Sequence, residues 1–139
     1  MNVLFDTNVV LDVLLERRPH SDAASKLFAL VDNGHLNGSI CATTATTVYY
    51  IAAKCFGSRR ARGQVHGLLG LFEVAQVDRD VLDSALDIDF SDYEDAVLHE
   101  AARAAGATVI VTRDRDDFVN SAIPALDPIE LLAVVAASK

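Results

Sequence analysis

The positions of the aspartates constrain the fold of this chain more than any other feature of its sequence. Asp6 directly follows the apolar run at residues 3–5, and Asp114 follows the strand-like run at residues 108–112. Asp92 and Asp95 open a helical segment before that second run. Two carboxylates about 4 Å apart repel by on the order of 4 kcal/mol at an effective dielectric of about 20. A fold that gathers such groups needs a cation, a shared proton or a basic ligand, and a divalent metal ion is the simplest candidate.

Apolar runs and helical periodicities alternate along the chain. Strands are expected at residues 2–6, 39–42, 71–77 and 108–112, with a short element near residues 123–126. Helices are expected around residues 9–16, 22–33, 48–55, from 59, around 81–86, 92–105 and from 127. Thr7 or Asn8 is the expected N-cap of the first helix, and Ser91 is that of the sixth, in a capping box with Glu94. This alternation predicts one domain over residues 1–139, an α/β sandwich with a mainly parallel sheet.

The fold class suggests where a site would lie. In parallel sheets, ligands bind outside the carboxyl ends of the strands, near the point where the strand order switches. Asp6 and Asp114 both follow predicted strands, so both are expected at that edge. Two aspartates expected at the same edge indicate a site there more strongly than either residue alone.

Composition limits the function classes. The net charge of −8 weighs against broad, nonspecific binding to nucleic acid, but it permits an enzyme that uses a bound metal and a local basic patch. No apolar stretch is long enough to cross a bilayer, and no basic region precedes the first apolar run, so we expect a cytoplasmic protein. Cys41 and Cys55 lack metal-ligand spacing and are expected to be buried thiols.

Three stretches, taken in order, resemble the PIN-domain family and within it the bacterial VapC-type toxins. They are Phe5-Asp6-Thr7-Asn8, Asp92-Tyr93-Glu94-Asp95-Ala96, and Thr112-Arg113-Asp114 through Asp117-Phe118. Their order and separation agree with the family over nearly the whole chain. The resemblance implies a three-layer α/β/α sandwich and a metal-dependent endoribonuclease, the toxin of a toxin–antitoxin pair. It also implies an antitoxin partner and a homodimer.

The resemblance assigns roles by position. Asp6 would be the central Mg²⁺ or Mn²⁺ ligand, with Asp95 on the helix and Asp114 after the strand as the other catalytic carboxylates. Asp92, one helical turn before Asp95, and Asp117 would be further metal ligands. The residues expected to orient carboxylates and water by hydrogen bonds are Thr7, Asn8, Thr47 and Thr112.

One departure from the family pattern leaves a second function open. Many PIN domains place a glutamate on the third helix, at a position that corresponds to about Thr47, and this chain has no acid from residue 33 to residue 72. The alternative is a catalytically impaired PIN-like domain that binds RNA or protein. A phosphate-accepting receiver domain is disfavoured, because neither Lys54 nor Lys139, the only lysines after Lys26, lies on a late strand.

Several residues allow both a functional and a plain structural interpretation. The basic residues Arg59, Arg60 and Arg62 form either an RNA-phosphate patch or a solvated helix face. Asp92 suits a helix cap as well as a metal site.

Other neighbours of the predicted site are similarly ambiguous. Arg113 and Arg115 flank Asp114, where they could neutralise the acids or contact substrate. His99 is more simply a histidine with satisfied hydrogen bonds than a site residue, and Tyr49 and Tyr50 are more simply helix-packing residues than base-stacking ones.

Overall fold

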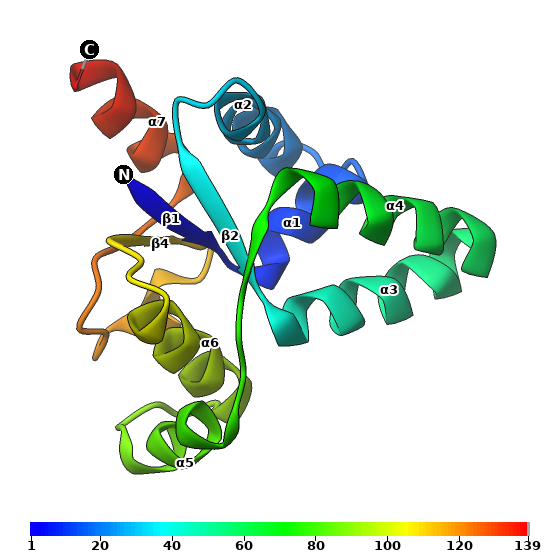
Figure 1. Cartoon of the computed structure of the whole chain (residues 1–139). Coiled ribbons are helices and arrows are strands. Elements are labelled where there is room, and N and C mark those ends of the chain that lie inside the picture. Colours follow the sequence, from blue (N-terminus) through cyan, green and yellow to red (C-terminus); the bar gives the residue numbers. More distant parts are fainter. Residues whose placement is uncertain (139) are drawn as a thin grey trace.

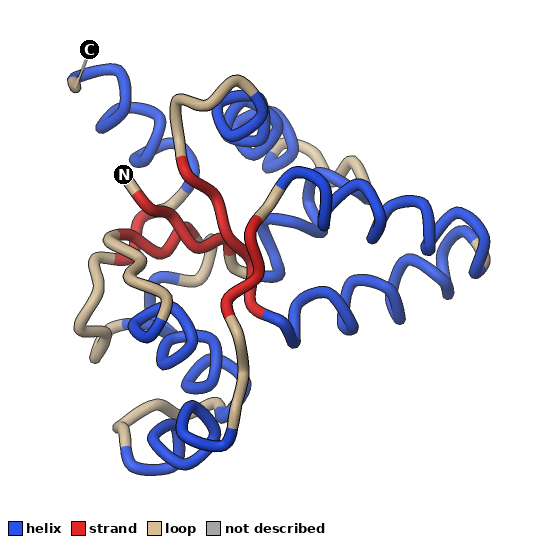
Figure 2. Tube along the Cα trace, in the orientation of Figure 1, coloured by secondary structure: helices blue, strands red, loops and turns tan. Residues whose placement is uncertain are grey.

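A computed structural model describes residues 1–138 and contains a five-stranded sheet in the order β3-β2-β1-β4-β5 (Figures 1 and 2). The strands are β1 (Asn2–Phe5), β2 (Asn37–Cys41), β3 (Glu73–Ala75), β4 (Val109–Val111) and β5 (Ala125–Leu126). Every pairing is parallel. The helices are α1 (Thr7–Leu14), α2 (His20–Asp32), α3 (Ala42–Phe56), α4 (Ser58–Leu71), α5 (Arg79–Asp87), α6 (Tyr93–Ala104), α7 (Pro128–Ala137) and the 3₁₀ turn η1 (Arg115–Phe118).

Alternating side chains of the central strand face two separate cores. Val3 and Phe5 of β1 pack with α1, α2, α3, α4 and α7, whereas Leu4 packs with α5 and α6. This alternation is the period-2 geometry of a strand that is buried on both faces. The expected three-layer α/β/α sandwich is therefore confirmed, with helices on both sides of the sheet (Figure 1).

Two helices reach beyond the sheet. The helices α3 and α4 pack against each other as a hairpin that projects from the body of the molecule (Figure 1). They are joined at Gly57, whose φ of 87° lies in the left-handed region that favours glycine. Cys55, near this turn, is exposed, so its predicted burial is wrong, although Cys41 is buried as expected. The helical spacing of Cys55 is that of a core face, but the last turn of α3 has no sheet to cover it.

Both predicted caps also need correction. The N-cap of α1 is Asp6, whose carboxylate accepts a hydrogen bond from the Thr7 amide, in place of Thr7 or Asn8. The N-cap of α6 is Asp92, which accepts from the Asp95 amide at 3.0 Å, in place of Ser91. In each helix a carboxylate takes the capping position and satisfies an amide of the first turn.

In the described part of the chain, no helix combines the length and the apolar character that spanning a membrane requires.

Candidate active site

Asp6 occupies the centre of the carboxyl edge of the sheet, between β1 and the end of β4. Its side chain is only 7% exposed. The Thr7 amide donates to Oδ1 at 2.8 Å, and the Thr112 hydroxyl donates to Oδ2 at 2.8 Å. Burial raises the pKa of Asp6, the two hydrogen bonds lower it, and the charges of Asp114 and Asp117 raise it further. The carboxylate is therefore fixed in orientation, and its charge is costly in the metal-free protein.

Asp114 is tied to Asp6 through Thr112 and Asn8. The Thr112 hydroxyl, which donates to Asp6, also accepts the Asp114 amide at 3.0 Å. The Asn8 side-chain amide donates to Asp114 Oδ2 at 3.0 Å, and its oxygen accepts the Arg113 amide at 3.4 Å. Thr112 and Asn8 thus bridge the first and fourth strands, and both lie where the sequence places them.

The helix α6 brings Asp92 and Asp95 to the same edge. Asp95 is partly buried, and its pKa is raised to about 7, first by burial and then by the charges of Asp6, Asp92, Asp117 and Asp114. The five carboxylates predicted as metal ligands therefore act on one another electrostatically. We call Asp6, Asp92, Asp95, Asp114 and Asp117 the acidic cluster.

The acidic cluster has no basic partner within residues 1–138, because none of its members forms an ion pair with Lys or Arg. Arg113 instead binds Asp12, with Nε 2.6 Å from Oδ2. Arg115 instead binds Glu130, with Nη1 3.0 Å from Oε2. Of the two roles considered for these arginines, neutralisation of the acids is wrong, and contact with substrate stays a prediction. The repulsion among the acids therefore remains uncompensated by these arginines.

Two residues that support this edge were not identified from the sequence. Asp12 on α1 is fully buried and is bound by Arg113 and by Arg17, whose Nε lies 2.9 Å from Oδ1. Thr44 is fully buried, and its hydroxyl is hydrogen-bonded to that of Thr7 at 2.9 Å. A charge inside the apolar stretch of α1 was the available signal for Asp12. Nothing in the sequence distinguished Thr44 from its threonine neighbours.

Neither Thr47 nor His99 forms a hydrogen bond to a member of the acidic cluster within residues 1–138. Thr47 is half-buried, and no side-chain hydrogen bond is formed by it within residues 1–138. His99 is buried, with Nδ1 2.8 Å from Glu100 Oε2 and Nε2 accepting the Ala122 amide at 3.1 Å. His99 therefore has the satisfied hydrogen bonds of a structural histidine, as the plain interpretation predicted.

The donor chemistry of the acidic cluster suits a hard divalent cation, since every predicted ligand is a carboxylate oxygen. Asp114 and Asp117 also line a hollow of about 440 Å³, whose other lining residues are Asp116, Asp127, Arg113 and Arg115. Among residues 1–138, however, no three Asp, Glu, His or Cys side chains are already close enough together to hold a metal ion. Carboxylates that no cation neutralises repel one another, and a bound divalent cation would offset that repulsion.

The comparison with known families decides the classification. The family model of the PIN domain matches residues 2–116. The chain belongs to the PIN-domain family. A search of curated proteins finds no match.

Solved structures share the fold of this PIN domain at low sequence identity. A chain of the toxin–antitoxin complex from Klebsiella pneumoniae is 22% identical, with a TM-score of 0.68 over 91% of this chain and 97% of that one. DNA-bound VapBC from Salmonella typhimurium gives 20% identity and a TM-score of 0.69 over 92% and 98%. VapC20 from Mycobacterium tuberculosis, a Sarcin-Ricin loop cleaving toxin, is 15% identical, with a TM-score of 0.63 over 78% of this chain and 86% of that one. The chain therefore has the fold of VapC toxin structures.

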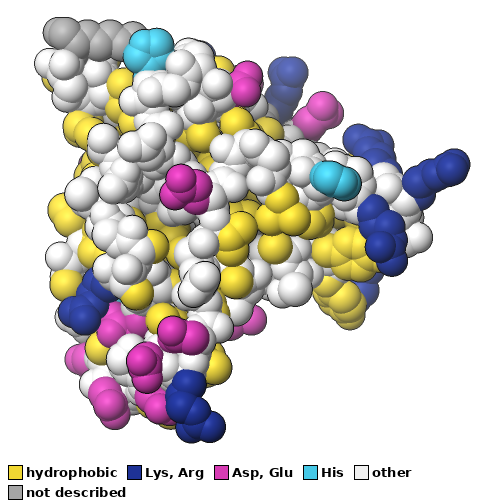
Figure 3. Space-filling model, viewed as in Figure 1, with side chains coloured by type: hydrophobic (Ala, Val, Ile, Leu, Met, Phe, Trp, Pro, Cys, Tyr) yellow, Lys and Arg dark blue, Asp and Glu magenta, His cyan; other side chains and the backbone are white. Residues whose placement is uncertain are grey.

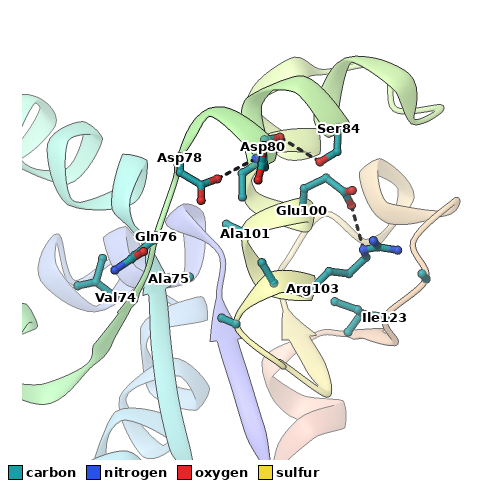
Figure 4. Close-up of a pocket in the computed structure, with 14 residues that line it drawn as sticks. Val74, Ala75, Gln76, Asp78, Asp80, Ser84, Glu100, Ala101, Arg103 and Ile123 are labelled. Carbon is teal, nitrogen blue, oxygen red and sulfur yellow. Dashed lines mark hydrogen bonds and ion pairs between the residues drawn. The ribbon is translucent and has the colours of Figure 1, made fainter.

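A second concavity of this PIN domain is separate from the acidic cluster. A groove of about 910 Å³ lies between β3, α5 and the later half of α6 (Figure 4). Ala75, Ala101 and Ile123 line it, with Glu100 and Arg103 paired at 3.4 Å on its wall. No member of the acidic cluster lines the groove, so it is not part of the candidate active site.

The raised pKa of Asp95 predicts how the stability of the metal-free PIN domain depends on pH. Unfolded Asp95 loses its proton near its ordinary pKa of 3.8, whereas folded Asp95 keeps the proton up to about pH 7. Between these values the folded state binds more protons, so the free energy of unfolding should fall as the pH rises. Urea midpoints in EDTA should therefore be lower at pH 8 than at pH 5. Asp95→Asn should reduce that difference, and an equal difference in the variant would contradict the assignment.

Proposed function

We propose that this PIN domain is a metal-dependent endoribonuclease and the toxin of a toxin–antitoxin pair. The observation that carries the proposal is the acidic cluster, which gathers five carboxylates at the carboxyl edge of a parallel sheet without a basic partner in residues 1–138. Such an arrangement is electrostatically unfavourable by itself and is stabilised by a bound cation. A phosphodiester, which is an anion, also needs a cation to approach these acids.

In this proposal Asp6, Asp95 and Asp114 hold Mg²⁺ or Mn²⁺, with Asp92 and Asp117 as further ligands. The bound ion would lower the pKa of a water molecule and stabilise the charge that develops on the phosphate. Each Asp6 oxygen accepts one hydrogen bond, which leaves a further lone pair on each for the ion. Thr112 and Asn8 fix the directions of Asp6 and Asp114, while Thr7 is held by Thr44.

The antitoxin partner and the homodimer are also proposals. The antitoxin partner is supported by the shared fold with chains of toxin–antitoxin complexes, including VapBC2 from Rickettsia felis, to which the chain is 16% identical. The homodimer rests on the family resemblance alone. An antitoxin that shields the acidic cluster would present positive charge to it, because the cluster has no basic partner of its own within residues 1–138.

One observation favours the alternative, a catalytically impaired domain that binds RNA or protein. The third helix α3 supplies no carboxylate, and its half-buried Thr47 makes no side-chain hydrogen bond within residues 1–138 that would place it in the site. The two functions make opposite predictions for metal binding and for cleavage.

The test is cleavage by partner-free protein of a panel of single-stranded and structured RNAs in Mg²⁺, Mn²⁺ or EDTA. We expect new RNA ends with either metal and none in EDTA. Calorimetric titration with Mn²⁺, followed by the same titration of Asp95→Asn, reports metal binding independently of the RNA chosen. If the folded protein binds no Mn²⁺ and cleaves no RNA, the nuclease proposal is rejected in favour of the catalytically impaired domain.

A further inference from the structure

The tip of the α3–α4 hairpin, residues 49–62, is positively charged and free of acids. Lys54, Arg59, Arg60 and Arg62 all lie on it, and all four are exposed. Within residues 1–138 none of them forms an ion pair, whereas Arg17, Arg103, Arg113 and Arg115 each pair with a carboxylate. Dark blue side chains gather on this projection in Figure 3. The hairpin tip therefore offers uncompensated positive charge.

Aromatic rings lie beneath these cations. Lys54 Nζ is 4.4 Å from the centre of the Tyr50 ring, and Arg60 Cζ is 3.9 Å from that of Phe56. Arg62 Cζ is 5.8 Å from the ring centre of Tyr49. A guanidinium stacked on a ring by its face keeps its N–H groups free to donate at its edge. Each pair thus combines a stacking surface with donors suited to phosphate oxygens.

Two of these rings are open to solvent. The exposed fractions are 61% for Tyr50 and 37% for Phe56. The expectation that Tyr50 is a helix-packing residue is therefore wrong. Exposed aromatic rings beside free basic groups are the combination that binds single-stranded nucleic acid, in which unpaired bases stack and phosphates pair with cations.

The negative charge on β3, α5 and α6 also favours binding of a polyanion at the hairpin tip. Between residues 73 and 104, over β3, α5 and α6, the chain has ten acidic residues and two arginines. Acidic side chains gather at the bottom of Figure 3, where α5 lies in Figure 1. RNA is repelled there and attracted to the hairpin tip, although the net charge of the chain is −8.

We propose that the hairpin tip is a binding site for single-stranded RNA. Arg59, Arg60 and Arg62 contact phosphates, and the exposed faces of Tyr50 and Phe56 receive unpaired bases. This inference rests on the proposed function, since it takes RNA to be the substrate, and it adds a remote contact that selects unstructured strands. From Thr44, which is hydrogen-bonded to Thr7 next to Asp6, to Phe56 the helix rises roughly 18 Å at about 1.5 Å per residue. The contacted nucleotides therefore lie well away from the bond that is cut.

The test measures binding without cleavage. Fluorescence anisotropy of a labelled 20-nucleotide unstructured RNA is recorded in EDTA, for wild type and for the triple variant Arg59→Ala/Arg60→Ala/Arg62→Ala. We expect at least a tenfold loss of affinity. The salt slope (log K against log [salt]) should become shallower by about 2, because each phosphate that an arginine neutralises adds about 0.7 to it. Arg79→Ala, an exposed arginine on α5, is the matched control and should bind like wild type.

Stacking is tested separately from charge. The double variant Tyr50→Ala/Phe56→Ala should bind single-stranded RNA several-fold more weakly than wild type does. Its affinity for a duplex RNA of equal length should be unchanged, because paired bases cannot stack on the rings. Equal effects on both RNAs would overturn the stacking part of the proposal. Unchanged circular dichroism and urea midpoints would exclude misfolding.

The outcomes separate this proposal from the nuclease itself. RNA binding that depends on the hairpin tip, without metal-dependent cleavage, would uphold this inference and overturn the proposed function. If the protein cleaves RNA in a metal-dependent way and the triple variant binds RNA as tightly as wild type, the proposed function is upheld and this inference is overturned. If the triple variant binds RNA normally but loses a co-expressed protein partner, the hairpin tip is a protein-docking surface and the RNA proposal is overturned.

Discussion

Replacing Asp6 or Asp95 by asparagine should lower the rate of RNA cleavage by at least about 100-fold, equivalent to ~2.7 kcal/mol of transition-state stabilisation. Asp6 is the most buried member of the acidic cluster, and Asp95 is influenced by all the others. An asparagine keeps the volume of the side chain but removes the charge that a divalent ion needs. The loss should appear in kcat under saturating Mg²⁺ or Mn²⁺, measured by single-turnover cleavage.

The Asp95→Asn substitution should also stabilise the metal-free protein. The pKa of Asp95 is raised by burial and by neighbouring charges, so its ionised form opposes folding near neutral pH, and asparagine removes that cost. Asp83→Asn, an exposed charge on α5, is the control and should change neither the cleavage rate nor the urea midpoint. Variants that lose cleavage and also become less stable in EDTA would indicate that these carboxylates serve the fold rather than the metal.

Removing Asp12 should have the largest effect on stability. Its carboxylate is fully buried and binds the guanidinium groups of Arg17 and Arg113. Asp12→Ala would leave both arginines without their partner inside a partly buried site and would also create a cavity. Breaking such a pair by removing one side costs about 3 kcal/mol or more. Urea unfolding in EDTA at pH 7 measures the loss, with the exposed Asp22→Ala on α2 as the control.

Asp12 should also affect the active site indirectly. The Arg113 amide donates to Asn8, and the Asn8 side chain holds Asp114, so release of Arg113 disturbs the direction of that carboxylate. Asp12→Asn, which keeps a hydrogen-bonding oxygen, should recover part of both stability and cleavage. If Asp12→Ala unfolds at the same urea concentration as wild type, the buried ion pairs contribute nothing and this account of α1 is incorrect.

How far the sequence predicts the structure depends on the range of each interaction. The position of Asp6 and Asp114 followed from local patterns, because both residues directly follow apolar strands, and in a parallel sheet those ends share one edge. The partners of Asp12 could not be found in this way, since Arg113 lies 101 residues away and approaches only when β1 and β4 pair. Local patterns identify the elements, whereas side-chain partners are chosen by the assembled fold.

The same limit explains the smaller errors. Cys55 satisfies the helical spacing of a core face, but spacing does not reveal where the sheet ends and a helix continues into solvent. Ser91 suited the expected cap, but the carboxylate of Asp92 accepts the helix amide. Arg113 and Arg115 adjoin Asp114 in sequence, yet each is drawn to a carboxylate on another helix.

The pairing of β1 with β4 has a consequence for synthesis of the protein. Thr112, which donates a hydrogen bond to Asp6, is translated 106 residues after it. The central strand β1 cannot pair with β4 until β4 has left the ribosome. A nascent chain that stops before β4 therefore lacks Thr112, Asp114 and Asp117 at this edge of the sheet. Any activity that depends on the whole acidic cluster can begin only after Asp117 has been translated and β4 has paired with β1.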